Sequence, residues 1–304
     1  MLPAGVQSGS RIEELVEEVN RGEEWEGVSV EEFAMALVTE SAEGIMPSFD
    51  EAKRRPDWPK WQMAISEELD NLEQNGTWEL VKCPKDTNVV NSKWVLQIKK
   101  NAAGEIEKYK ARLVARGFTQ VYGVDYYKTY TPVAKLSTFQ LILAITARNG
   151  WSIDSFDFNS TYLNSVLQGE TIYLKQPPDH ATKPRNKWVC QLIKTIYGLK
   201  QGVKNWYNAL CEALRAVGFK RSEANHGLFF KEEDNHLVIL VIHVDNCLIT
   251  GSLTSLIKKA KDDLSQHYSL TDLGSANWLW ASKSHKISLS ITYHFLNMPT
   301  SSRS

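Results

Sequence analysis

The sequence predicts an α+β fold in which a mostly antiparallel sheet packs on helices. Strand-like runs rich in Val, Ile and Leu are joined by short turns, and this arrangement favours antiparallel pairing. Between these runs lie segments whose apolar residues recur at helical spacing. The chain has 304 residues, of which 42% are hydrophobic and 23% charged, and this composition is ordinary for a globular protein.

The first half of the fold is predicted to begin with a helix that ends near Gly76. Its apolar positions fall at helical spacing in WPKWQMAISEELDNLEQNG. Three strand-like runs follow, TWELV, VVNSKWVLQIKK and IEKYKARLVARGF, and NAAG at residues 101–104 joins the last two as a hairpin loop. An apolar helix is then expected over LSTFQLILAITARNG, with Ser137 as its N-cap and Gly150 at its end.

The second half is predicted to contain a strand, two helices and a hairpin. WSIDSFDF alternates and predicts a strand whose inward residues include Ile153 or Phe156. Helices are expected over about residues 203–217 and 253–266. The hairpin lies between them in LVILVIHVDNCLITG, residues 237–251.

Two polar residues, Asp245 and Asn246, interrupt that apolar hairpin. A plain turn explains them, because Asn and Asp tolerate the positive φ of a tight hairpin. The alternative is that the turn presents a carboxylate to a divalent metal. A second carboxylate, Asp157, ends the strand WSIDSFDF, where it could instead cap a turn. Two carboxylates on adjacent strand ends are suited to Mg²⁺ that bridges substrate phosphates, so both interpretations stay open at this point.

A basic strand face offers a candidate phosphate-binding surface. Lys108, Lys110 and Arg112 alternate in KYKARLVAR and therefore share one face of a strand. That face could simply be solvated, or it could fold over a triphosphate or a nucleic-acid backbone.

Charge is unevenly distributed along the chain. Residues 1–57 carry 14 acidic and 5 basic side chains, whereas the rest carry 22 acidic and 30 basic ones. We expect residues 1–46 to be an acidic, weakly ordered leader. No signal peptide or membrane-spanning run is predicted, so an intracellular location, cytoplasm or nucleus, without membrane partners is expected. The four separated cysteines favour a reducing compartment.

The chain resembles the reverse transcriptase domain of copia-type LTR retrotransposon polyproteins. The resemblance covers residues 47–274 and rests on the order of several motifs. These motifs are WQMAISEELDNLEQNGTWELV, KWVLQIKK, YKARLVARGFTQVYGVDYYKTYTPVAKLST, DFNSTYLN, TIYLKQPP, IYGLKQ, NWYNAL, GFKRSEANHGLF and HVDN. Residues 275–304 look like an abbreviated remnant of the segment that follows in the family.

The resemblance implies a right-hand polymerase fold with fingers and palm, and a truncated thumb or connection. It implies an RNA-directed DNA polymerase, a nucleotidyltransferase that uses Mg²⁺, with Mn²⁺ as an alternative. Its partners would be an RNA or DNA template with primer and deoxynucleoside triphosphates. The implied metal ligands are Asp157, Asp245 and the backbone carbonyl of Phe158, and the implied nucleotide-binding residues are Lys110, Arg112, Tyr162 and Gln201. The oligomeric state is not predicted.

The sequence departs from the family pattern at the residues that carry the chemistry. Asn246 stands where the family has a third catalytic carboxylate, and His243 replaces a tyrosine with a group that titrates near neutral pH. Val203 and Gln140 are further departures. We therefore expect polymerisation to be impaired in this chain. Independently, we expect the carboxylates of Asp157 and Asp245 to lie about 4–8 Å apart, a distance that one or two Mg²⁺ ions could bridge. The alternatives are a non-catalytic remnant that keeps the fold and binds nucleic acid, and a structural or interaction protein.

Overall fold

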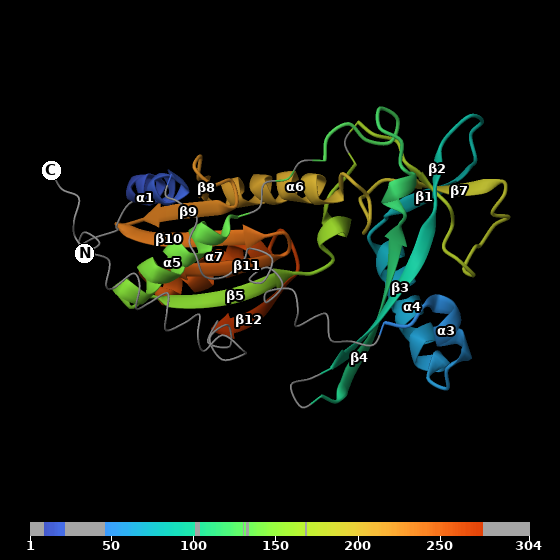
Figure 1. The fold of residues 1–304 in the computed structure, drawn as a ribbon, viewed down its shortest axis with the longest axis horizontal. Helices are drawn as coiled ribbons and strands as arrows, with labels where there is room; N and C mark the ends of the chain where they lie inside the picture. The colour runs from blue at the N-terminus through green and yellow to red at the C-terminus, as the bar shows by residue number, and fades with distance from the viewer. Residues whose placement is uncertain are drawn as a thin grey trace. The chain divides into compact units, whose positions relative to one another are not determined.

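A computed structural model describes residues 9–21, 46–100, 104–129, 131, 134–167 and 169–275 (Figure 1). The chain divides into two compact units, each built from separate stretches of sequence. Unit 1 comprises the described residues within 1–33, 132–159 and 210–304, and unit 2 those within 34–131 and 160–209. No helix among the described residues combines the length and apolar character needed to cross a membrane.

Unit 1 is built on a six-stranded sheet in which every pair of neighbours is antiparallel. The prediction of a mostly antiparallel sheet is therefore confirmed. In spatial order the strands are β12 (Leu270–Ser275), β5 (Ser152–Phe158), β11 (Asn246–Gly251), β10 (His236–His243), β9 (Leu228–Glu233) and β8 (Lys220–Arg221).

Helices cover both faces of this sheet, and β5 shows how the two faces differ. Ile153 lies in one hydrophobic cluster with residues of α1 (Gly9–Arg21) and α5 (Leu136–Asn149). Its neighbour Asp154 points to the opposite face, where it meets α7 (Thr254–Ser265). Because both faces are covered, Phe156 is buried as fully as Ile153, and the strand carries few exposed positions.

Two predictions about local structure differ from what the structure describes. The segment expected to be a weakly ordered leader contains α1. Its Ile12, Leu15 and Val16 are buried in the hydrophobic cluster of unit 1. The apolar helix α5 begins at Leu136 with Lys135 at its N-cap, so Ser137 is not the cap. The predicted end of α5 is confirmed, because Gly150 adopts φ +65°, a left-handed conformation that favours glycine.

Unit 2 contains two small sheets and a separate hydrophobic core. The predicted first helix is α4 (Trp58–Gln74), preceded by α3 (Phe49–Arg54), and its Trp61, Ile65 and Leu72 are buried. The predicted hairpin is β3 (Ser92–Lys100) paired with β4 (Ile106–Ala115), and its loop residues 101–103 lie outside the described residues. The second sheet consists of β1 (Trp78–Lys82), β7 (Trp188–Leu192), β6 (Tyr173–Leu174) and β2 (Val89–Val90).

Short helical turns and the long helix α6 complete the described elements. The turns are η2 (Gly117–Thr119) and η3 (Thr161–Asn164), and α6 spans Gly202–Ala216. The domain boundaries predicted at residues 46 and 274 stay a prediction. Apart from Ser275, the predicted C-terminal remnant lies outside the described residues.

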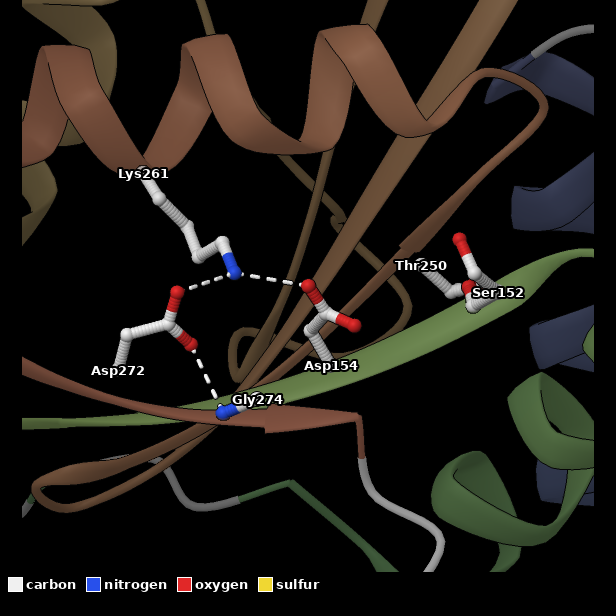
Figure 2. A network of polar contacts seen from close by, with 6 residues as sticks. All are labelled: Ser152, Asp154, Thr250, Lys261, Asp272 and Gly274. Carbon is white, nitrogen blue, oxygen red and sulfur yellow. Dashed lines mark hydrogen bonds and ion pairs between the residues drawn. The ribbon is translucent and has the colours of Figure 1, made fainter.

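A buried lysine ties α7 to two strands of the unit 1 sheet (Figure 2). The Nζ of Lys261 donates to Asp154 of β5 and to Asp272 of β12, at 2.7 Å in each case. Burial lowers the pKa of Lys261, but its two carboxylate partners outweigh burial and hold the pKa above the ordinary value of 10.5. The hydrogen bond from Lys261 holds the pKa of Asp272 below the ordinary value of 3.8.

We predict that Lys261→Met destabilises the protein at pH 7 by about 2–3 kcal/mol, because it leaves Asp154 charged and partly buried without its cation. This is below the roughly 3–5 kcal/mol typical of a broken buried pair, since Asp272 is partly exposed. Urea unfolding measures the change. Lys259, on the same helix as Lys261, forms a more exposed ion pair with Glu233 of β9. Lys259→Ala is therefore the matched control and should change stability little.

The pair between Lys261 and Asp272 also makes the stability of the protein depend on pH. A carboxyl whose folded pKa is depressed contributes stability above its unfolded pKa and loses it as pH falls through the folded value. The difference between wild type and Lys261→Met should therefore shrink as pH falls below 3.8. A difference that stays constant down to pH 2 would contradict this assignment.

Candidate functional site

The turn between β10 and β11 lies one residue earlier than the sequence suggested. His243 pairs with Asn246, so the turn consists of Val244 and Asp245, and Asn246 is the first residue of β11. Val244 has φ +62°, whereas Asp245 is not among the residues with positive φ. This is the sign pattern of a type II′ turn, which usually has glycine at its first central position. A β-branched residue there stores backbone strain, and such strain clusters at functional sites.

Pairing between β5 and β11 brings the predicted catalytic residues to one end of the sheet. Asn246 lies opposite Asp157 in the antiparallel register, so their side chains emerge on the same face. The backbone N–H of Phe158 donates to the carbonyl of Asp245 at 3.2 Å. The ends of β5 and of the turn are therefore held by direct backbone contact. The predicted separation of 4–8 Å between the carboxylates stays a prediction.

Cys247 reports on the electrostatics of this end of the sheet. Burial raises the pKa of its thiol well above 9.0, and the negative charges of Asp157 and Asp245 raise it further. Both carboxylates thus act on one buried group, which places their charges in the same region of unit 1. Cys247 was not among the predicted site residues, although its position directly after Asn246 in a buried strand was the available signal.

The surroundings of His243 disfavour its charged form, although the sequence showed only a group that titrates near neutral pH. It is half-buried, with the Phe139 ring edge-on at a centroid distance of 6.4 Å. Burial lowers the pKa of His243 below 6.5, and the nearby Asp245 carboxylate only partly opposes this.

The donor set at this end suits a hard cation but is incomplete. Asp157 and Asp245 supply carboxylate oxygens, which Mg²⁺ prefers, whereas the Nδ2 of Asn246 donates to Oδ1 of Asp245 at 3.2 Å. Within the described ranges, no group of three or more His, Cys, Asp and Glu side chains could hold a metal ion. Any cation bound by the two aspartates would need further oxygens from backbone, water or substrate.

The predicted phosphate-binding residues lie in unit 2, on β4. Lys108, Lys110 and Arg112 alternate as predicted, and acidic residues of α4 lie beside them. Lys108 forms a 3.1 Å ion pair with Glu67. Burial raises the pKa of Glu68, and the hydrogen bond from Leu113 N and then the charges of Arg112 and Lys110 oppose that rise. The basic face is thus partly neutralised by α4.

Arg112 keeps one unsatisfied donor. Its guanidinium lies over the Tyr197 ring, with Cζ at 5.0 Å from the ring centroid. Its buried Nε has no hydrogen-bond acceptor in the structure. A buried donor of this kind calls for an acceptor, and a phosphate oxygen is the natural partner of arginine.

The two remaining candidates, Tyr162 and Gln201, also belong to unit 2. The Tyr162 ring is half-buried and packs edge-on against Tyr197 at a centroid distance of 4.7 Å. Gln201 is fully buried. Its Nε2 donates to the carbonyl of Asp125 at 2.9 Å and to Glu170 at 2.8 Å. In this conformation Gln201 offers no surface to a nucleotide, so the geometry supports a scaffolding role for it.

Comparisons with known proteins show which family this chain resembles. The family described as reverse transcriptase (RNA-dependent DNA polymerase) matches residues 75–296. The retrovirus-related Pol polyprotein from transposon RE2 of Arabidopsis thaliana is 36% identical over 214 residues, which cover 70% of this chain and 15% of that polyprotein. The corresponding polyprotein from transposon TNT 1-94 of Nicotiana tabacum is 32% identical over 237 residues, 78% of this chain and 18% of that protein. The chain therefore spans less than a fifth of the length of these relatives.

We predict that His243 in the metal-free protein titrates below 6.5, because burial disfavours its charged form. The unfolded chain then binds more protons between the folded pKa and 6.5, so stability rises with pH through that window. An NMR titration of the imidazole protons in chelator-treated protein measures the pKa, and His243→Tyr identifies the signal. A midpoint above 6.5 would refute this assignment.

Proposed function

The chain belongs to the reverse transcriptase (RNA-dependent DNA polymerase) family, as the sequence resemblance predicted, and on that premise we propose that it is a metal-dependent RNA-directed DNA polymerase domain impaired in this copy. In this proposal unit 1 acts as the palm and unit 2 as the fingers of a right-hand polymerase. One observation carries the proposal: the β5–β11 register sets Asp157 opposite Asn246 while Phe158 bonds to Asp245.

In this proposal different residues bind the metals and the phosphates during phosphoryl transfer. Bound divalent metals would neutralise charge on the attacking and leaving oxygens of an in-line displacement. Asp157, Asp245 and the Phe158 carbonyl would hold them at the sheet end. The unsatisfied Nε of Arg112 would donate to a phosphate oxygen of the incoming nucleotide, with Lys110 on the same strand face.

Asn246 supports the proposal of impairment. Its amide gives no negative charge, and its Nδ2 donates to an oxygen of Asp245 that a cation would otherwise use. Losing one electrostatic contributor of this kind typically costs about 10²–10³ in rate. The same observation favours a second candidate, a non-catalytic remnant that keeps nucleic-acid affinity without extending a primer.

We predict that Asn246→Asp strengthens metal binding at the sheet end and lowers stability in the metal-free state. The added carboxylate replaces a hydrogen bond with repulsion beside Asp245, and a dication would relieve that repulsion. The melting temperature of the variant should fall in EDTA and recover in millimolar Mg²⁺, whereas the wild type should change little. Primer extension on an RNA template should rise about 10²–10³-fold.

Two controls separate the alternatives. Asp157→Asn in the Asn246→Asp background should abolish both the Mg²⁺ effect and extension. His243→Tyr alone should leave the Mg²⁺ response unchanged, because burial lowers the pKa of His243 and so disfavours a positive charge there. If the unmodified chain extends a primer as well as Asn246→Asp does, the proposed impairment is wrong.

We also predict that Tyr162 excludes ribonucleotides. An aromatic ring beneath the sugar would clash with a 2′-hydroxyl, so Tyr162→Ala in the Asn246→Asp background should raise ribonucleotide incorporation relative to deoxynucleotide incorporation. Steady-state kinetics with both nucleotides measures the ratio. Tyr197→Ala, which removes the ring packed against Tyr162, controls for a general loss of packing. Unchanged discrimination would leave Tyr162 as a core tyrosine only.

A further inference from the structure

One short segment of unit 2 exposes an unusual share of aromatic surface. We name Arg116–Lys128 the aromatic loop. Within it Phe118, Tyr122 and Tyr127 are 76%, 69% and 56% exposed. Of the twelve exposed large hydrophobic residues among the described residues, five lie in this loop. Such a concentration on a surface marks an interaction site more often than chance exposure.

Buried polar residues hold this loop in one shape. Asp125 is almost fully buried and accepts from the N–H of Val121 at 2.7 Å and from Nδ2 of Asn88 at 2.5 Å. Gln120, also buried, donates to Oε1 of Gln201 at 3.1 Å, and Gln201 in turn donates to the carbonyl of Asp125. The exposed rings therefore sit on a rigid base, which lowers the entropy lost when a ligand binds.

The motif IYGLKQ fastens the base of the loop. A Cβ on Gly117 would lie 2.2 Å from the carbonyl oxygen of Gly198, and Gly198 has φ +86°, so both positions require glycine. The N–H of Lys200 donates to Oε1 of Gln120 at 2.8 Å. This motif therefore fixes the position of the aromatic loop, in addition to any role near a nucleotide.

The exposed charges of the loop have a single sign. Arg116 and Lys128 are exposed, whereas the loop's one carboxylate, Asp125, is buried and committed to internal hydrogen bonds. Lys200 lies over the Tyr126 ring at 4.9 Å from its centroid and donates to its hydroxyl. A surface of exposed rings and cations without exposed acids complements a polyanion that also offers flat apolar faces.

We propose that the aromatic loop binds single-stranded nucleic acid by stacking unpaired bases on Phe118 and Tyr122, while Arg116, Lys128 and Lys200 contact the phosphates. Base stacking on aromatic side chains tolerates any sequence, and cations that follow the backbone supply affinity. In a duplex the faces of the bases are covered, so the loop distinguishes unpaired from paired strands. This proposal names where unpaired template is held and so rests on the proposed function.

The test measures binding directly with the full chain. Fluorescence anisotropy reports the Kd for a labelled 20-nucleotide single-stranded RNA and for a blunt duplex of the same sequence. The double variant Phe118→Leu/Tyr122→Leu keeps apolar surface but removes the rings, and should weaken single-strand binding at least tenfold with duplex binding unchanged. Phe118→Tyr/Tyr122→Phe keeps both rings and should bind within twofold of wild type. Met63→Ala removes an equally exposed apolar side chain outside the loop and should have no effect.

Three results would overturn the proposal. The leucine variant could bind single strands as tightly as wild type, or it could lose single-strand and duplex affinity equally. It could also lose self-association in sedimentation velocity without losing RNA affinity, which would assign the loop to a second copy of the chain. Primer extension by Asn246→Asp is measured in parallel. If the RNA affinity depends on the loop but the Asn246→Asp variant extends no primer, the proposed function is contradicted while single-strand binding by the aromatic loop is supported.

Discussion

The antiparallel register between β5 and β11 is the constraint on which the candidate site depends. It sets Asp157 opposite Asn246, and the bond from Phe158 N to the Asp245 carbonyl joins the strand end to the turn. A slip of one residue would send Asp157 to the other face of the sheet. That register is supported by apolar residues on both faces and by Lys261, which binds β5 and β12 to α7 from the opposite face.

The same hairpin shows how local stability and metal chemistry oppose each other. Asn246 donates to Asp245, so the metal-free hairpin contains a hydrogen bond where a third carboxylate would create repulsion. The negative charge that would cause this repulsion is the same charge that would attract a divalent cation. The turn also holds Val244 at φ +62°, a conformation that is strained for a β-branched residue.

Unit 2 shows a second use of buried polar groups, in which they fix a surface. Gln201 and Gln120 are buried with their amides bonded to one another, and Asp125, inside the aromatic loop, accepts a hydrogen bond from the N–H of Val121 in the same loop. Removing one member of such a network would leave the others unsatisfied in a low-dielectric interior. We therefore infer that Gln201 positions the aromatic loop through its hydrogen bonds to Gln120 and Asp125.

The sequence by itself determined the periodic elements, the antiparallel sheet, the family, the strand that carries Asp157 and the hairpin that carries Asp245, because these depend on local spacing and on motifs. Gly150 was found for the same reason, since its left-handed conformation is a local requirement. Only the tertiary structure decided that the turn begins at Val244, that burial lowers the pKa of His243 and that Gln201 is buried. Each of these depends on which groups from distant segments surround a residue, and spacing along the chain carries no record of that environment.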